Sequence, residues 1–211
     1  MLAAFSLGIL ISASITIHAE YKHRARQLYI FKPLTTALIW VFALQRPADG
    51  ATLYHYAILT GLGFSLGGDI FLMFPQRYFL AGLASFWLGH LAYSTAFASI
   101  NGPQISLWWL LPGLGYASGV LLFLRGKLGP MKFPVLAYML VILLMAGQAL
   151  ELWSASRSPL ALCGAGGALL FLFSDTALAI NRFHHQYRDS PLVVLGSYYC
   201  AQWLIALSIG G

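Results

Sequence analysis

The chain contains 211 residues, of which 59% are hydrophobic and only 9% are charged. Soluble domains carry about a quarter charged residues, so this composition excludes a water-soluble globular domain and indicates a membrane protein. The formal net charge of +6 does not indicate nucleic-acid binding, because the basic residues are scattered through short segments between apolar runs.

Apolar runs divide the chain into segments long enough to cross a bilayer as helices, which takes about 20 largely apolar residues each. The first run, 2–19, follows no positive residue and precedes a basic cluster, so we interpret it as a retained span and not as a signal peptide. Seven more runs follow, separated by short polar or Pro/Gly-containing segments: 28–45, 54–74, 78–99, 105–124, 133–153, 159–180 and 191–209. The sequence therefore predicts an all-α, polytopic membrane helix bundle with eight transmembrane helices, in which residues 1–211 form a single domain without a soluble appendage.

Lys and Arg are divided unevenly between alternate loops, and cytoplasmic loops normally carry the excess. One set of loops contains only Arg46 and Arg157. The other set contains Lys22, Arg24, Arg26, Arg77, Arg125, Lys127, Lys132, Arg182 and Arg188. We expect the second set to be cytoplasmic and both termini to lie on the non-cytoplasmic side, in a multi-pass protein of the bacterial inner (cytoplasmic) membrane.

Three charged residues lie inside predicted spans at similar depth. Lys32 falls in the first turns of the second span, and Asp69 and Asp175 fall in the last turns of the third and seventh spans. About five residues separate each aspartate from its helix end, or roughly 8 Å at 1.5 Å per residue. An ionised carboxylate in hydrocarbon costs at least about 2.5–3.5 kcal/mol, so it normally faces a partner or a watery cavity.

Two aspartates at one depth predict one shared polar cavity. Repulsion between Asp69 and Asp175 would leave one protonated and the other ionised, which is an acid/base pair suited to hydrolysis. The alternative is structural: Lys32 or Arg182 pairs with an aspartate only to hold helices together. Lys32 itself, near the interface, can either meet a phosphate group or extend its ammonium group to the surface.

Other polar side chains within the spans also have two interpretations. His90, with Tyr93 three residues later on nearly the same helix face, is either a functional group or a hydrogen-bonded core histidine. Tyr198, Tyr199 and Gln202 either line the same cavity or join helices through hydrogen bonds. Small residues before Asp69 allow close approach of a ligand or, more commonly, of another helix: Gly61, Gly63, Ser65, Gly67 and Gly68.

No metal site is predicted. Cys163 and Cys200 fall inside apolar runs without metal or disulfide spacing. His184 and His185 adjoin Arg182 in a loop, and no H-E-x-x-H pattern is present. We therefore expect neither a metal nor another cofactor.

A set of short motifs occurs in a fixed order between residues 32 and 202. They are Lys32-Pro33-x-Thr35-Thr36, Gly68-Asp69-x-x-Leu72-Met73, Phe86-x-x-x-His90-x-x-Tyr93, Gly167-Ala168-x-x-Phe171-x-x-Ser174-Asp175 with Arg182-Phe183, and Tyr198-Tyr199-x-Ala201-Gln202. Together they resemble the YhhN-like lysoplasmalogenase family, although each motif alone is short.

The resemblance implies an eight-span enzyme that hydrolyses the vinyl ether bond of lysoplasmalogens. The products would be a fatty aldehyde and glycerophosphoethanolamine or glycerophosphocholine. The two intramembrane aspartates of the family match Asp69 and Asp175. Our hypothesis is that one donates the proton and the other, ionised, stabilises the cationic intermediate; the sequence leaves open which does which. The substrate would be a lysophospholipid drawn from membrane lipids, with no nucleic acid bound. We predict that it contacts Lys32, Thr36, Ser65, His90, Tyr93, Ser174, Arg182, Tyr198, Tyr199 and Gln202.

Three other functions compete with this hypothesis. A proton- or solute-coupled transporter also uses paired intramembrane aspartates. A ceramidase-like lipid hydrolase would need a histidine-rich metal site, and a non-catalytic scaffold would have no use for two costly buried acids. Oligomeric state and head-group preference are left undecided by the sequence.

Overall fold

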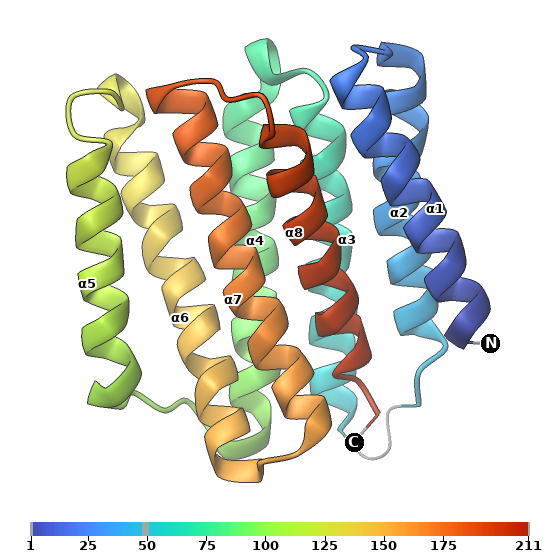
Figure 1. The fold of residues 1–211 in the computed structure, drawn as a ribbon. Helices are drawn as coiled ribbons and strands as arrows, with labels where there is room; N and C mark the ends of the chain where they lie inside the picture. The colour runs from blue at the N-terminus through green and yellow to red at the C-terminus, as the bar shows by residue number, and fades with distance from the viewer. Residues whose placement is uncertain (1, 48–50, 211) are drawn as a thin grey trace.

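The computed structural model describes residues 2–47 and 51–210, and within these ranges the chain forms eight α-helices and two short helical turns, without a β-strand (Figure 1). The α-helices are α1 (Leu2–Tyr21), α2 (Ala25–Leu44), α3 (Thr52–Leu72), α4 (Pro75–Asn101), α5 (Leu107–Phe123), α6 (Lys132–Ser156), α7 (Pro159–Ala179) and α8 (Ser190–Leu207). A 3-10 turn, η1 (Gly129–Met131), precedes α6, and a π-helical turn, η2 (Ile180–His184), continues α7. The all-α prediction is confirmed.

Each predicted span corresponds to one helix, with ends that differ by a few residues. Helix α4 begins earlier than expected because Pro75 suits the first helical turn, while Tyr78 breaks the helical geometry just after it with φ −119° and ψ 20°. Helix α6 continues to Ser156, and Arg157 then leaves the helix in the left-handed conformation with φ 51°. Helix α3 ends at Leu72 and not at the predicted residue 74, so Asp69 lies only three residues before the helix end, nearer than expected.

Five stretches within the described part of the chain are long and apolar enough to cross a bilayer: Ala4–Tyr21, Ala25–Leu44, Gly129–Ser156, Pro159–His184 and Ser190–Leu207. Helix α5 is apolar but has only 17 residues. Helices α3 and α4 bury several polar side chains in the bundle, including Ser65, Asp69 and His90. Large apolar side chains cover the outside, such as Phe133 at 78% exposure, as expected where lipid is the solvent.

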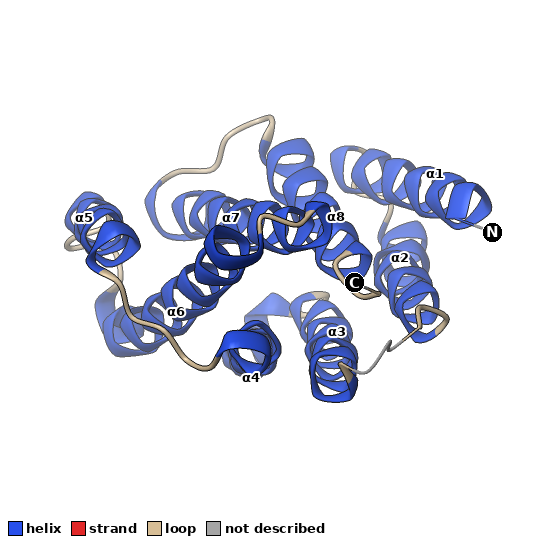
Figure 2. Ribbon diagram, turned by 90° about the horizontal axis from the view of Figure 1, so that it is seen from below, coloured by secondary structure: helices blue, strands red, loops and turns tan. Residues whose placement is uncertain are grey.

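The helices run side by side, with α5 at one edge and α1 at the other (Figure 2). Helix α3 packs along α4, α7 along α8, and α1 along α2, while α6 contacts both α4 and α7. Close packing depends on glycines: a Cβ on Gly68 would lie 2.5 Å from the Phe86 ring, and one on Gly167 would lie 2.8 Å from the Ala201 carbonyl oxygen. These contacts favour helix packing as the role of the glycine at 68.

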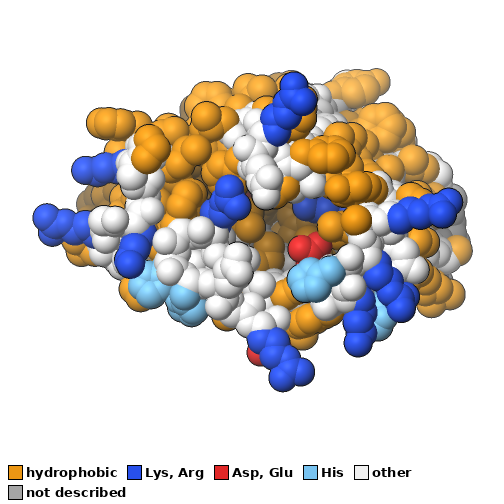
Figure 3. Space-filling view, turned by 90° about the horizontal axis from the view of Figure 1, so that it is seen from above, with side chains coloured by type: hydrophobic (Ala, Val, Ile, Leu, Met, Phe, Trp, Pro, Cys, Tyr) orange, Lys and Arg blue, Asp and Glu red, His pale blue; other side chains and the backbone are white. Residues whose placement is uncertain are grey.

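Both ends of the chain lie at the same end of the bundle (Figure 1). The opposite end holds the α1–α2, α3–α4, α5–α6 and α7–α8 connections, where the larger set of basic residues is located. Viewed from that end, Lys and Arg side chains surround a hollow, with an acidic side chain beside it (Figure 3). We call this the basic end.

Candidate active site

Asp69 is held where α2, α3 and α8 meet, close to the basic end. Its side chain is 2% exposed. The Thr36 hydroxyl donates to Oδ2 at 2.6 Å, and the Tyr198 hydroxyl donates to the same oxygen at 2.8 Å. Lys32 Nζ lies 3.9 Å from Oδ1. Hydrogen bonds to a charged acceptor are stronger than neutral ones, so this set of donors suits an ionised carboxylate.

A second layer of buried side chains orients the Tyr198 hydroxyl. Gln202 Nε2 donates to it at 3.2 Å, and Gln202 Oε1 accepts a 2.6 Å hydrogen bond from the Tyr93 hydroxyl. Ser65 Oγ lies 3.5 Å from the same Tyr93 oxygen. With its own lone pair engaged by Gln202, Tyr198 is free to donate its proton to Asp69.

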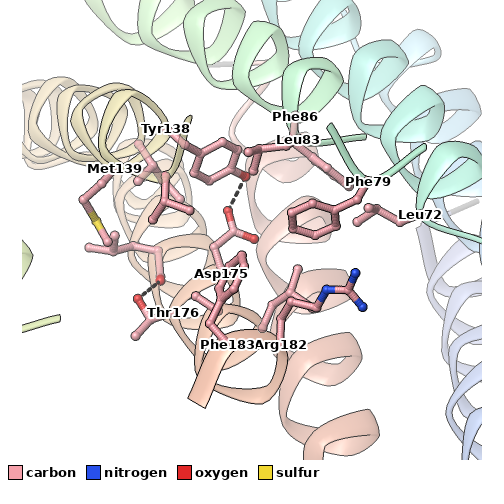
Figure 4. A pocket seen from close by; sticks show the side chains of 15 residues that line it. Leu72, Phe79, Leu83, Phe86, Tyr138, Met139, Asp175, Thr176, Arg182 and Phe183 are labelled. Atoms are coloured by element: carbon pink, nitrogen blue, oxygen red, sulfur yellow. Dashed lines mark hydrogen bonds between the residues drawn. The ribbon is translucent and has the colours of Figure 1, made fainter. Parts of the chain in front are cut away.

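Asp175 occupies a different environment, between α4, α6 and α7. The Tyr138 hydroxyl donates to Oδ2 at 2.5 Å, and His90 Nε2 lies 3.3 Å from that oxygen and 2.8 Å from the Tyr138 oxygen. The Asp175 side chain is 17% exposed, whereas His90 is fully buried against the Phe171 ring. Figure 4 shows both partners of the Tyr138–Asp175 bond, with the second carboxyl oxygen facing the space beside Phe79.

Both aspartates line one cavity of about 240 Å³, which we call the inner cavity. It also receives side chains from α2, α7, α8 and the α7–α8 connection, among them the predicted residues Lys32, Ser174, Arg182 and Tyr198. Within the described chain the two carboxyl groups form no hydrogen bond with each other. Each is served by its own donors, so the cavity presents two separately held carboxyl groups.

An apolar pocket of about 60 Å³ adjoins the inner cavity, and we call it the apolar arm (Figure 4). Asp175 and Arg182 line both spaces, and the Arg182 guanidinium lies 5.0 Å from the centre of the Phe79 ring. The remaining lining is mostly aliphatic and aromatic: Leu72, Phe79, Leu83, Phe86, Val135, Tyr138, Met139, Ile142, Leu172, Thr176, Leu178, Ala179 and Phe183. Asp175 therefore lies at the junction of a polar space and an apolar one.

The other predicted site residues lie behind this lining. Thr36, Ser65, His90, Tyr93 and Gln202 support the two aspartates through the hydrogen bonds described above. Tyr199 is buried and donates to the Lys32 carbonyl oxygen at 3.5 Å. Direct contact of these six residues with a substrate stays a prediction.

Tyr138 is a site residue that sequence reasoning missed. It lies in an apolar run of α6 with no short motif around it, and only the fold brings its hydroxyl to Asp175. The signal in the sequence is weak: a tyrosine buried in a membrane helix usually needs a partner for its hydroxyl.

The acidic and histidine residues do not assemble into a metal site in the described part of the chain. No group of three or more His, Cys, Asp or Glu side chains there is arranged to hold an ion. His184 and His185 contact each other through their Nδ1 atoms at 2.7 Å, but they form only a pair.

Comparison with known proteins places these residues in a family. The model of the YhhN family matches residues 27–209. The membrane protein YhhN of Escherichia coli O6:H1, described as uncharacterized, is 29% identical over 205 residues, covering 96% of this chain and 97% of that protein. Lysoplasmalogenase TMEM86A of Bos taurus is 34% identical over 189 residues, covering 85% and 76%.

A further relative, lysoplasmalogenase TMEM86B of Mus musculus, is 30% identical over 208 residues, covering 98% of this chain and 85% of that protein. No solved structure matches the chain. The family model covers most of the chain, including both aspartates and the side chains that hold them. The chain is a membrane protein that belongs to the YhhN family.

Proposed function

We propose that this protein is a lysoplasmalogenase, which hydrolyses the vinyl ether bond of a lysoplasmalogen to a fatty aldehyde and glycerophosphoethanolamine or glycerophosphocholine. One observation carries the proposal: two separately held carboxyl groups line one cavity that continues into an apolar arm. Relatives named lysoplasmalogenase, at 30–34% identity, support the substrate class.

The polarity of the two spaces determines how the substrate is oriented. Its alkenyl chain enters the apolar arm, and its glycerophosphate group lies in the inner cavity, where Lys32 and Arg182 supply positive charge. The vinyl ether then lies at the junction, next to Asp175. The whole site is close to the basic end, which we assign to the cytoplasmic side of an eight-span topology in the bacterial inner membrane.

The two aspartates take different roles because their donors differ. Asp69 accepts from two hydroxyl groups and forms an ion pair with the Lys32 ammonium group 3.9 Å away, so it is the ionised partner. Asp175 borders the apolar arm and has one carboxyl oxygen turned toward the pocket, so it is the proton donor.

The proposed reaction then has three steps. Asp175 transfers its proton to the vinyl carbon remote from oxygen, which leaves an oxocarbenium ion and an Asp175 carboxylate. Water adds to the cationic carbon, forms a hemiacetal and returns a proton to Asp175, while ionised Asp69 stabilises the positive charge. The hemiacetal collapses to an aldehyde and the free glycerol hydroxyl, with one water consumed overall.

The decisive test is aldehyde release from lysoplasmenylethanolamine by purified protein in detergent micelles. We expect stoichiometric fatty aldehyde and glycerophosphoethanolamine from the wild type. The saturated 1-alkyl ether analogue is the matched control and should not be cleaved, because it has no double bond to protonate. Failure of the wild type to release aldehyde, together with solute flux in liposomes, would instead identify a transporter.

A further inference from the structure

Glu20 stands at the entrance to the inner cavity and has no role in the reaction derived above. It lies in the last turn of α1, which ends at Tyr21. Glu20 lines the inner cavity and also a wide recess of about 930 Å³ at the basic end, which we call the outer recess. Asn181, Gln186 and Ser190 line both spaces as well. The outer recess is therefore the polar mouth of the inner cavity.

The Glu20 carboxylate is half-buried and has no ion-pair partner among the residues that the structure describes. The ion pairs within the described residues are Lys32 with Asp69 and His90 with Asp175, and neither includes Glu20. No side-chain hydrogen bond involves it in the same part of the chain; only its backbone carbonyl accepts, from the His23 amide. A carboxylate left unpaired beside a cavity is an available site for a cation.

Side chains of both charges line the two spaces, as a zwitterionic headgroup requires, and Lys22 and Arg188 also line the outer recess. Lys32 and Arg182 line the inner cavity, where the phosphate lies in the proposed function, and Glu20 lies at the boundary with the mouth. An ethanolamine headgroup places a primary ammonium just beyond its phosphate. That ammonium has three N–H donors, and the Glu20 carboxylate with the side-chain carbonyls of Asn181 and Gln186 can accept them.

A choline headgroup carries the same charge but has no N–H to donate. It would satisfy Glu20 only by charge, and its three methyl groups would keep the cation away from the carboxylate oxygens. We propose that Glu20 binds the primary ammonium of the substrate and makes this protein select ethanolamine over choline lysophospholipids. The inference rests on the proposed function and names the headgroup that the same site takes.

Glu20 also lies outside the range that the family model matches. The family model begins at residue 27, whereas Asp69 and Asp175 lie well inside it.

The first test measures headgroup selectivity. We expect the wild type to have a higher kcat/KM for lysoplasmenylethanolamine than for lysoplasmenylcholine. Glu20→Gln should lower kcat/KM for the ethanolamine lipid about tenfold, the change that about 1.4 kcal/mol produces, mainly through KM, and leave the choline lipid nearly unchanged. Asp189→Asn is the matched control: this exposed carboxylate lines the outer recess but not the inner cavity, so its removal should leave the ratio intact.

A second test separates headgroup binding from catalysis. The Kd of saturated 1-hexadecyl ether lysophosphoethanolamine is compared with that of its choline analogue, in the wild type and in Glu20→Gln. Tighter ethanolamine binding that disappears in the variant supports the inference even if no aldehyde is released, in which case only the proposed function fails. Equal binding of both headgroups by the wild type, a choline preference, or an equal loss for both lipids in Glu20→Gln overturns it.

Discussion

Asp69 and Asp175 lie at similar depth and line the same cavity, yet the protein surrounds them differently. Asp69 is 2% exposed and accepts from Thr36 and Tyr198 with Lys32 nearby, whereas Asp175 is 17% exposed, accepts from Tyr138 and faces an apolar arm. Identical side chains therefore receive different support: Asp69 has two hydroxyl donors and a lysine counter-ion, whereas Asp175 has one hydroxyl donor and a histidine and borders an apolar arm. The comparison teaches that two aspartates lining one cavity are distinguished by their neighbours, and the proposed acid and anion roles rest on that difference.

Removing the carboxyl group of Asp175 should have the largest effect. Asp175→Asn eliminates the proton donor, and we expect kcat to fall at least about 1000-fold, within the range that general acids contribute. The measurement is aldehyde release, with thermal unfolding in detergent as the folding control. Asp69→Asn should cost less, about 100-fold, the scale seen when one electrostatic stabiliser is lost.

The solvent isotope effect sharpens this contrast. Proton transfer to carbon is rate-limiting in vinyl ether hydrolysis, so the wild type and Asp69→Asn should both react more slowly in D₂O. Residual turnover in Asp175→Asn should no longer depend on an enzyme-bound acid. If Asp69→Asn loses the slowing in D₂O while Asp175→Asn keeps it, the two roles are reversed.

Removing a hydroxyl group that binds an aspartate should lower kcat less than removing the carboxyl group, and again the loss should be larger at Asp175 than at Asp69. Tyr138→Phe removes the only hydroxyl donor that the structure describes on Asp175. We expect kcat to fall about tenfold, because this donor stabilises the Asp175 carboxylate that forms as the proton leaves, and hydrogen bonds to charged groups contribute about 1.5–3 kcal/mol. Tyr198→Phe should cost only a few-fold, since Thr36 and Lys32 still support Asp69.

Tyr54→Phe is the control for these variants. Its hydroxyl forms a buried 2.7 Å hydrogen bond with Ser208 at the opposite end of the bundle, so it tests the loss of a tyrosine hydroxyl away from the cavity. We expect unchanged kcat in Tyr54→Phe. A loss of activity equal to that of Tyr138→Phe would mean that destabilised packing explains both.

Metal removal should have the smallest effect. The proposed chemistry uses only carboxyl groups and water, and the described His, Cys, Asp and Glu residues form no cluster of three or more. We expect full aldehyde release in excess chelator. Activity that is abolished by the chelator and restored by zinc would contradict the assignment of both aspartates.

Much of the helical framework was predictable because each helix coincides with one continuous apolar run bounded by polar or Pro/Gly segments. Lys32, Asp69 and Asp175 were also predicted at one depth, since loop charge orients the spans and helix rise converts sequence position to depth. In the structure both aspartates line one cavity, as expected from their predicted depth. The helix ends were less predictable, because local features such as Pro75 and the left-handed Arg157 decide them.

The supporting residues were harder to infer. Tyr138 was missed because an apolar run contains nothing that marks which helix face meets α7. Thr36, His90 and Gln202 were predicted to touch the substrate, and the fold places them one layer behind the cavity as partners of Asp69, Asp175 and Tyr198. A motif indicates that a polar residue is near the site, but the packing of neighbouring helices decides which side of it faces the cavity.

The sequence by itself determined the solvent of this protein, its helical segments and the costly carboxyl groups within them, because these depend on composition, hydrophobic length and charge along one dimension. Only the tertiary structure decided that Asp69 meets Thr36, Tyr198 and Lys32 and that Asp175 meets Tyr138 beside an apolar arm. It also decided that Glu20 lines the mouth of the cavity. The reason is geometric: these side chains come from different helices, and the rotation and close approach of each helix, set by contacts such as Gly68 against Phe86, decide which groups meet.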